Sequence, residues 1–216
     1  MEKMSDFFTS RISTYDAHMI NNVEGCKDAY KKMAVLIPES CKNLLDLGCG
    51  TGLELDEIFK FFPDIAVTGI DLTQAMLEKL KSKHPGKKME LICGDYFSTP
   101  FKNNYDCAVS FQTLHHFTHE EKTGLYSKIY SALKPNGQYI ECDYMAETQE
   151  EEDFYFAENV RIRSELGIPT KDFYHYDTPC TIENQKKMLM KAGFSDIKTE
   201  FKMGFTTILT AYKYAD

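Results

Sequence analysis

The chain has 216 residues, which is enough for one domain with a large core, and its 43% hydrophobic and 27% charged residues are typical of a globular protein. A net charge of −8 argues against a general binder of nucleic-acid backbones, and no apolar run approaches the roughly 20 residues of a membrane span. The first residues lack the apolar region of a signal peptide, so we expect a cytoplasmic protein with neither nucleic acid nor membrane among its partners.

Cysteine usage argues against a disulfide framework and against a structural zinc site. The seven cysteines are an odd number, and none of them forms a CxxC pair. Most of them are expected as small core residues in a reducing compartment. We therefore expect no metal in this protein.

Residues 1–38 are predicted to form helices that act as a lid. Residues 5–22 mix aromatic, charged and small polar types with weak helical spacing, which indicates one or two short helices over the site. A clearer helix follows, because apolar side chains recur at helical spacing from Ala29 to Leu36, until Pro38 ends the pattern.

From residue 40 to residue 145 the chain alternates buried strands with helices. This alternation implies right-handed crossovers and a parallel sheet that is covered on both faces. Thr118 and Glu121 have the spacing of a capping box, which opens one of the helices. We expect strands at 44–46, 65–71, 89–93, 105–111 and 138–144, and helices from 53, from 73 to about 83 and from 118 to about 133, the last one broken by the turn at 134–137.

The alternation lapses over residues 146–180, and we expect this insertion to cap the substrate pocket. It holds an acidic run from Glu147 to Asp153, then a helix around 154–166, then a loop rich in proline and tyrosine. The acidic run is read either as part of the pocket or as a solvated helix start.

Residues 181–216 complete a single domain. We expect a helix to about Ala192, stopped by Gly193, and then two apolar strands near 197–203 and 205–212. The short link between these strands can form only a hairpin, so one of them runs antiparallel to its neighbours.

The stretch from Leu44 to Gly52 reads as a strand, a glycine turn and a helix start, which together form a ligand cradle. Its glycines are Gly48, Gly50 and Gly52, and free N–H groups at the helix start are expected to face the ligand. Leu53 stands where the third glycine of a dinucleotide fingerprint would fall. The loop therefore differs from a pyrophosphate site, and it also lacks the lysine of a P-loop.

Two acidic residues follow the next strands and are candidates for binding a nucleoside. Asp71 ends the second strand, where a carboxylate can accept hydrogen bonds from both ribose hydroxyls. Asp95 follows the third strand beside Tyr96 and can accept a hydrogen bond from an adenine amino group. The alternatives are a helix-dipole role for Asp71 and turn formation for Asp95.

These features together resemble the class I S-adenosylmethionine-dependent methyltransferases over about residues 40–145. No single motif is specific to this family, but the combination of motifs is. The motifs that carry the resemblance are Leu45-Asp46-Leu47-Gly48-Cys49-Gly50-Thr51-Gly52, Gly69-Ile70-Asp71, Gly94-Asp95, Tyr105-Asp106 through Leu114-His115-His116-Phe117, and Leu133-Lys134-Pro135-Asn136-Gly137.

The resemblance implies an α/β fold, with a doubly wound, mostly parallel seven-stranded sheet of Rossmann-like type, an antiparallel last strand and a small helical cap. It also implies S-adenosylmethionine as cofactor. Carried over by position, the amino-acid end of the cofactor would lie at Asp46, Gly48, Cys49, Gly50 and Gly52, the ribose at Asp71, the adenine at Leu72, Asp95 and Tyr96, and the methionine moiety near Phe111 and Gln112.

The implied reaction is direct in-line displacement, which needs a general base only when the acceptor must lose a proton. The candidates for such a base are His115, His116 and His175, with Glu141 and Asp143 near the end of the fifth strand. The paired histidines can equally be structural. Metal binding by histidines of this region is disfavoured, because adjacent residues rarely converge on one ion.

Several side chains outside the resemblance are candidates for binding the acceptor. Tyr15 and Asp16 are expected to close over the cofactor, and an acceptor pocket is expected to be lined by His175 and Asp177 with Tyr144, Tyr155, Tyr174 and Tyr176. An aromatic and acidic lining would suit an amine or another cationic acceptor. The alternative is that the tyrosines pack the insertion.

The sequence therefore predicts a methyltransferase with a small-molecule acceptor, acting as a monomer or a homodimer. A methyltransferase for tRNA or protein is the alternative among enzymes. A protein that binds S-adenosylmethionine or S-adenosylhomocysteine without turnover and an NAD enzyme are alternatives of other classes.

Overall fold

A computed structural model describes residues 1–169 and 172–215 of the chain, and its centre is a mixed β-sheet. The strand order is β3-β2-β1-β4-β5-β8-β7, with a short extra strand, β6, beside β5. The first five strands of this order are parallel, whereas β8 is antiparallel to both of its neighbours. The strands are β1 (Asn43–Leu47), β2 (Ala66–Asp71), β3 (Met89–Cys93), β4 (Tyr105–Phe111), β5 (Leu133–Ala146), β6 (Cys180–Thr181), β7 (Ser195–Met203) and β8 (Thr206–Tyr212).

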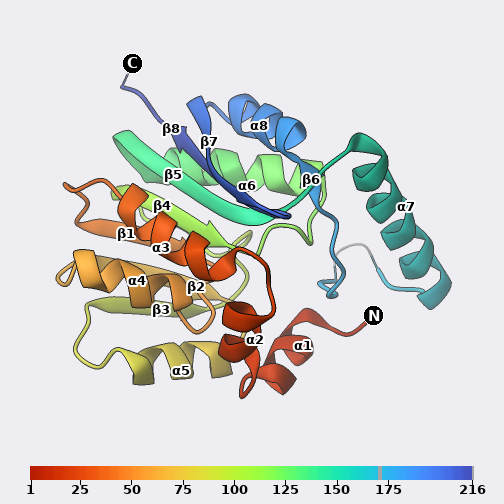
Figure 1. Cartoon of the computed structure of the whole chain (residues 1–216), viewed down its shortest axis with the longest axis horizontal. Helices are drawn as coiled ribbons and strands as arrows, with labels where there is room; N and C mark the ends of the chain where they lie inside the picture. Colours follow the sequence, from red (N-terminus) through yellow and green to blue (C-terminus); the bar gives the residue numbers. More distant parts are fainter. Residues whose placement is uncertain (170–171, 216) are drawn as a thin grey trace.

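The predicted fold class is confirmed, including the antiparallel last strand. Helices cover both faces of the sheet, as Figure 1 shows. The helices are α1 (Met4–Arg11), α2 (Tyr15–Asn21), α3 (Cys26–Leu36), α4 (Leu53–Phe61), α5 (Gln74–Lys83), α6 (His119–Ala132), α7 (Gln149–Leu166) and α8 (Ile182–Lys191).

Two hydrophobic cores result from this arrangement, one on each face of the sheet. Successive strand residues point to opposite faces, so in β1 the side chain of Leu44 belongs to one core and that of Leu45 to the other. The first core packs α3, α4 and α5 against the sheet, and the second packs α6 and α8. Leu44 and Leu45 are fully buried, as expected for a strand in the middle of a doubly wound sheet.

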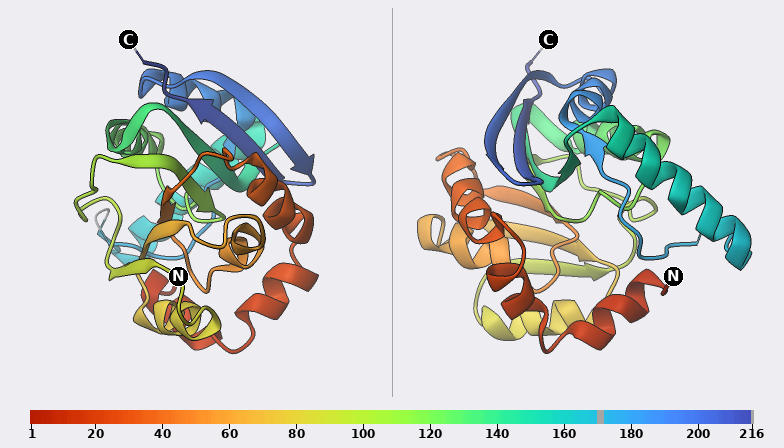
Figure 2. Two further views of the ribbon diagram at one scale, coloured as in Figure 1. Left: turned by 90° about the vertical axis from the view of Figure 1, so that its left-hand side faces the viewer. Right: turned by 45° about the vertical axis from the view of Figure 1, so that its right-hand side comes forward.

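The N-terminal lid pairs with the loop that precedes β6. The N–H of Met4 donates to the Phe173 carbonyl at 3.1 Å, and the N–H of His175 donates to the Glu2 carbonyl at 3.0 Å. The right-hand view in Figure 2 shows α1 and α2 below the sheet, with α7 extending away from the rest of the fold. Two segments far apart in sequence therefore meet over one end of the sheet.

Local signals in the sequence place most element ends correctly. The capping box at Thr118 forms, and Gly193, with φ of 109°, follows the end of α8. Three details differ. β5 begins directly after α6, with the expected turn reduced to an irregularity that includes Asn136 at φ 62°. The helix expected at 154–166 begins at Gln149, because the Thr148 side chain caps it by accepting from the Glu151 N–H.

The third difference concerns the hairpin, which we expected to consist of two apolar strands. β8 is buried because it lies between β5 and β7, whereas β7 is the edge strand and is largely exposed. Within residues 1–169 and 172–215, none of the helices has the length and apolar character that crossing a membrane requires.

Candidate active site

The glycine loop lies between β1 and α4 and has left-handed backbone at all three predicted glycines. The φ angles are 68° at Gly48, 47° at Gly50 and 72° at Gly52, which L-residues rarely adopt. A Cβ atom at Gly48 would lie 2.3 Å from the Thr113 hydroxyl oxygen, so a larger residue does not fit there. At Gly50 the nearest atom to such a Cβ is a carbonyl oxygen at 3.9 Å, so this glycine opens toward free space.

Three amide groups of this loop point inward, toward the end of β2, and the N–H groups at the start of α4, which were expected to face the ligand, are not among them. The N–H groups of Gly48 and Cys49 both donate to the Ile70 carbonyl, at 2.8 and 3.2 Å. The Gly50 N–H donates to the Asp71 carboxylate at 2.9 Å. These donors hold the loop against the end of β2 and are not available to an anion, which agrees with the absence of a pyrophosphate fingerprint.

Asp46 and Glu54 are buried carboxylic acids that lack partners for hydrogen bonds. Asp46 is fully buried, and neither of its carboxylate oxygens has a hydrogen-bond partner within the described residues. Glu54, in the first turn of α4, is 5% exposed, and one of its carboxylate oxygens has no hydrogen-bond partner within the described residues. Burial raises the pKa of Asp46 to about 7, and the Asp71 carboxylate adds to this rise, whereas the side chain of Glu54 opposes it. Burial and the Asp46 carboxylate raise the pKa of Glu54. Acceptors of this kind fit a buried cation such as the ammonium of an amino acid.

Asp71 lies at the end of β2, and both of its oxygens already accept one backbone hydrogen bond. The donors are the N–H groups of Gly50 at 2.9 Å and Thr73 at 2.8 Å. Burial raises the pKa of Asp71 to about 6, although these two N–H groups oppose the shift. Each carboxylate oxygen has a further lone pair, so the ribose role predicted for Asp71 is compatible with this geometry.

A narrow cavity of about 40 Å³ lies beside Asp71 and brings together most of the predicted nucleoside-binding residues. Asp95 caps the next turn, because its Oδ1 accepts the N–H groups of Phe97 and Ser98 at 2.8 and 2.9 Å. The competing role of turn formation is thus confirmed for Asp95, and its adenine role stays a prediction. The cavity is lined by Gly48, Asp71, Leu72, Gly94, Asp95, Tyr96 and Thr113, by Met4 and Phe8 of the lid, and by Thr73 and three further phenylalanines.

Three of the predicted cofactor residues, Cys49, Phe111 and Gln112, do not line the narrow cavity. The Cys49 side chain is buried against Gly69 of β2, so only its backbone is placed to meet a ligand. Phe111 stacks on Tyr30 of α3, with ring centroids 3.9 Å apart, and belongs to the core. Gln112, with φ of 49°, turns the chain at the end of β4 and lines a larger cavity.

The lid is tied to the glycine loop by a contact that the sequence did not reveal. The Thr51 hydroxyl donates to Oδ1 of Asp16 at 2.7 Å, and Lys79 of α5 approaches the other oxygen at 2.9 Å. The same ammonium group donates to the Ile12 carbonyl at 3.1 Å. Tyr15, at the start of α2, lines the larger cavity described next, and its closure over the cofactor stays a prediction.

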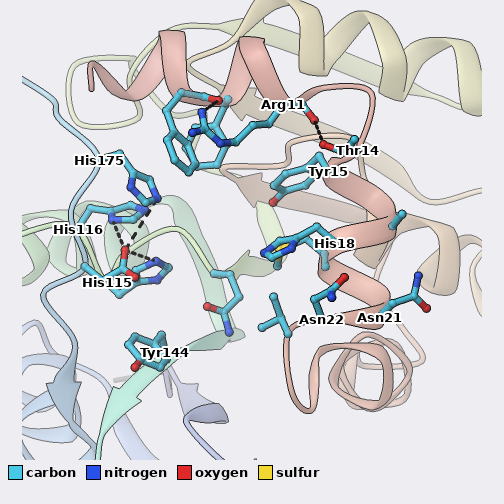
Figure 3. Close-up of a pocket in the computed structure, with 17 residues that line it drawn as sticks. Arg11, Thr14, Tyr15, His18, Asn21, Asn22, His115, His116, Tyr144 and His175 are labelled. Atoms are coloured by element: carbon cyan, nitrogen blue, oxygen red, sulfur yellow. Dashed lines mark hydrogen bonds and ion pairs between the residues drawn. The ribbon is translucent and has the colours of Figure 1, made fainter. Parts of the chain in front are cut away.

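A larger cavity of about 770 Å³ opens between the lid and the carboxyl ends of β4 and β5 (Figure 3). Phe8 lines both this cavity and the narrow one, and Gln112 of the larger adjoins Thr113 of the smaller, so the two are neighbours. The lining of the larger cavity comprises Phe7, Phe8, Arg11, Thr14, Tyr15, Ala17, His18, Met19, Asn21, Asn22, Val23, Gln112, His115, His116, Tyr144, His175 and Asp177.

Three histidines of this lining, His115, His116 and His175, face α2 across the cavity, as Figure 3 shows. His115 Nδ1 lies 2.6 Å from Oδ1 of the buried Asp143 of β5. Burial disfavours the imidazolium, but the Asp143 carboxylate outweighs that effect and raises the pKa of His115. A carboxylate only accepts, so Nδ1 carries the proton and the Nε2 atom of neutral His115 carries the lone pair.

His116 and His175 complete the histidine cluster that was predicted from sequence. The ring centroids of His116 lie 4.1 Å from His115 and 4.9 Å from His175, and His175 stacks on Phe7 of α1 at 3.6 Å. Burial, together with the two neighbouring imidazoles, lowers the pKa of His116 well below its usual value. The structure thus brings together the three candidate bases, although their roles stay predictions.

The predicted acceptor residues are only partly assembled. Tyr15 and Tyr144 line the large cavity. Tyr174 lies elsewhere, in a β-bridge with Lys3, and Tyr176 contributes a backbone carbonyl 3.2 Å from His116 Nδ1. Glu141, a further candidate base, is buried beneath α6 and does not line the cavity; it accepts from the Tyr126 hydroxyl at 2.9 Å.

The lining of the large cavity is not the acidic one that the sequence suggested. Its only acidic side chain among the described residues is Asp177, which faces Arg11 and four histidines. The acidic run lies on α7, where Glu152 is buried against His119 at 2.7 Å and the neighbouring acids are exposed or half-buried. The expectation of a cationic acceptor therefore loses its support.

Comparison with known proteins agrees with this site. A family model described as "Methyltransferase domain" matches residues 44–137, which include the glycine loop and the paired histidines. The malonyl-[acyl-carrier protein] O-methyltransferase of Priestia megaterium is 33% identical over 141 residues, covering 62% of this chain and 48% of that protein. The chain therefore spans about half the length of this relative.

Two further relatives are similar over more of their length. The carboxy-S-adenosyl-L-methionine synthase of Campylobacter concisus is 25% identical over 194 residues, covering 85% of this chain and 82% of that protein. A crystal structure of a putative O-methyltransferase from Nostoc punctiforme shares the fold, with a TM-score of 0.72, 20% identity and coverage of 99% of this chain and 62% of that one.

Proposed function

We propose that the chain is a class I S-adenosylmethionine-dependent methyltransferase and that it methylates a small-molecule acceptor bound in the 770 Å³ cavity. The observation that carries the proposal is the position of this cavity. It adjoins the narrow cavity beside Asp71 through Phe8, and its volume is within the range of small-ligand pockets.

The chain's own residues fit S-adenosylmethionine at the glycine loop. The buried acceptors of Asp46 and Glu54, which lack partners, match the ammonium of its amino-acid end. Asp71 and Leu72 line the neighbouring narrow cavity, where the resemblance places the ribose and the adenine. When bound, this cofactor supplies a methyl group on a sulfonium, which is electrophilic enough for direct displacement once the acceptor is aligned.

The remaining role of the protein is to bind, orient and deprotonate the acceptor. The lid lies over the site, and Asp16 ties α2 to Thr51 of the glycine loop. The lone pair on Nε2 of His115 is held in place by Asp143 and is positioned at the cavity wall. It can take the proton of a hydroxyl or thiol acceptor, and the Arg11 and histidine lining favours acceptors that carry a negative or ionisable group.

The test combines binding with turnover. We expect calorimetry to show 1:1 binding of S-adenosylmethionine and S-adenosylhomocysteine, and a release assay for the latter to identify turnover within a panel of hydroxy acids, phenols, thiols and amines. Tight binding without turnover on any acceptor would instead identify a non-catalytic binding protein. Turnover only on tRNA or on protein would contradict the small-molecule proposal, and binding of NAD in place of both nucleotides would contradict the cofactor.

A further inference from the structure

The carboxylate of Asp177 lies in the middle of the histidine cluster without bonding to it. Its Oδ1 atom is 3.4 Å from His116 Nδ1, 3.6 Å from His115 Nε2 and 3.9 Å from His175 Nε2. These contacts exceed the usual hydrogen-bond range of about 2.7–3.2 Å. This oxygen is buried and has no hydrogen-bond partner within the described residues. Three imidazoles around one carboxylate oxygen without a bonded partner need a further explanation.

The spacing matches a set of ligands around a tetrahedral metal ion. Zinc binds imidazole nitrogen and carboxylate oxygen at about 2.0–2.2 Å, so neighbouring ligand atoms of a tetrahedral site lie about 3.3–3.5 Å apart. The distances from Asp177 to His116 and His115 are close to that edge length. We propose that His115, His116 and Asp177 bind a divalent transition-metal ion of the zinc type, with His175 beside them as a further donor.

The surroundings of His115 have the form of a metal-binding histidine. Metal-ligating histidines usually donate their other ring N–H to a carboxylate, which fixes the ring and its tautomer. Asp143 supplies that carboxylate 2.6 Å from Nδ1, which leaves the Nε2 lone pair on the side of Asp177. His116 lies 3.2 Å from the Tyr176 carbonyl through the same Nδ1 that faces Asp177, so ligation by this atom replaces that contact.

The donor set and its position narrow the kind of ion. Two or three imidazoles with one carboxylate suit zinc or a similar borderline ion, whereas magnesium and calcium prefer oxygen ligands. All four side chains line the large cavity, so the ion has an open side toward the acceptor. A hydroxyl or thiol that enters this open position loses its proton more readily, and the ion then replaces His115 as the activating group. That consequence rests on the proposed function, whereas the metal site itself does not.

A second group with metal-binding side chains is a poorer candidate. His119, Glu152 and Cys180 lie within 4.8 Å of one another. However, the buried ammonium of Lys122 lies 3.3 Å from the Cys180 sulfur and repels a second cation. Glu152 already accepts from His119 and from the amide of Asn184 at 2.9 Å. This group is satisfied without an ion, unlike Asp177.

The experiment measures binding of Zn²⁺ and of Co²⁺, its spectroscopic substitute, to the full chain after treatment with a chelator. We expect one ion per chain, no comparable binding of Mg²⁺, and a cobalt spectrum without a thiolate band. Asp177→Asn and His116→Gln should each weaken binding by more than 100-fold, and Asp143→Asn by about 10–100-fold because it only positions His115. His18→Gln in the same cavity and Cys180→Ser in the second group are matched controls that should bind as the wild type does.

Each other outcome overturns the assignment. Failure to retain one ion per chain would exclude the site, and binding that persists in Asp177→Asn would place the ion elsewhere. A cobalt–thiolate band that Cys180→Ser removes would assign the ion to the second group. Thermal unfolding of every variant shows that it is folded, and Asp177, whose side chain is 42% exposed, is a position that tolerates the change. Because no acceptor or cofactor is present, this result is independent of whether methyl transfer is found.

Discussion

The cofactor side and the acceptor side of the site are built in different ways. On the cofactor side, Asp46, Gly48 and Asp71 come from consecutive strand ends of one parallel sheet, and the loop is held by its own backbone. On the acceptor side, His115 meets Asp143 and Asp177, which lie 28 and 62 residues further along the chain. Neighbouring strand ends thus form the cofactor side, while contacts between residues far apart in the sequence form the acceptor side. Changes on the two sides should therefore separate in kinetic measurements.

The largest expected effect is on the acceptor side. We expect His115→Ala to lower kcat by about 10²–10⁴-fold, the usual range for the loss of a group that moves a proton. Affinity for S-adenosylmethionine should change little, because His115 lines the large cavity and not the narrow one. Steady-state kinetics and calorimetry measure the two quantities, and His18→Ala serves as the control in the same cavity. If His115→Ala lowered cofactor affinity as much as it lowers kcat, the cofactor side and the acceptor side would not act separately.

The corresponding change on the cofactor side is Asp46→Asn. Removing one member of a buried ion pair costs about 3–5 kcal/mol, so we expect cofactor affinity to fall by two to three orders of magnitude. The cofactor-free protein should become more stable at pH 8 by about 1–3 kcal/mol, because a buried carboxylate without a partner is lost. Calorimetry and urea unfolding test both parts. Glu57→Gln, in the surface ion pair with Lys60 on α4, is the control and should change neither quantity.

Asp71→Ala tests whether Asp71 binds the ribose of the cofactor. It should weaken cofactor binding by about 1–3 kcal/mol, since it removes the acceptor for the ribose and also frees the Gly50 N–H. Asp95→Asn is the matched comparison, because its oxygens serve the turn at Phe97 and Ser98. An unchanged affinity in Asp71→Ala would contradict the ribose assignment.

The affinity for the cofactor should also depend on pH. The pKa of Asp46 is raised to about 7 by burial and by Asp71, so this carboxyl is largely protonated below that pH in the free protein. An ammonium ligand binds its ionised form, so the affinity should fall by up to tenfold per pH unit below about 7, with release of a proton on binding. Calorimetry in buffers of different ionisation enthalpy measures this release, and Asp46→Asn should abolish it.

The same pKa has the opposite consequence for the stability of the cofactor-free protein. A carboxyl whose folded-state pKa exceeds its unfolded value of 3.8 is destabilising once it ionises. The protein therefore loses stability as the pH rises from about 4 to about 7. An unfolding free energy that did not fall across this window, relative to Asp46→Asn, would show that the Asp46 carboxylate has a partner.

The contrast between the two sides also explains what could be predicted from the sequence. The order of elements, the antiparallel hairpin and the glycine loop follow from local patterns, and all were predicted. The inward-facing amides were not, because their acceptor is the Ile70 carbonyl of the neighbouring strand. Likewise, the role of Asp143 depends on the register of β4 against β5, in which Phe111 lies beside Cys142. No spacing along the chain gives that register.

The acceptor side was predicted least well for the same reason. His175 and Asp177 were recognised as candidates, but their meeting with His115 depends on a loop that pairs with the N-terminal residues Lys3 and Glu2. Tyrosines of the same loop looked equivalent in sequence, yet Tyr174 faces another surface. Adjacent histidines were judged unlikely to share an ion, and the carboxylate that lies between their nitrogens could not be foreseen.

The smallest expected effect lies where the two sides meet, at the contact between the lid and the glycine loop. Asp16→Asn keeps the size of the side chain but removes the charge that pairs with Lys79 at 2.9 Å. We expect this change to loosen the lid by about 0.5–1.5 kcal/mol, which raises KM for cofactor and acceptor together by a few-fold. Faster hydrogen exchange of residues 4–21 is the direct measurement. Asp28→Asn, on an exposed pair with Lys31, is the control. A rise in only one KM would show that the lid serves one side alone, and the contact at Thr51 would then not couple the two regions.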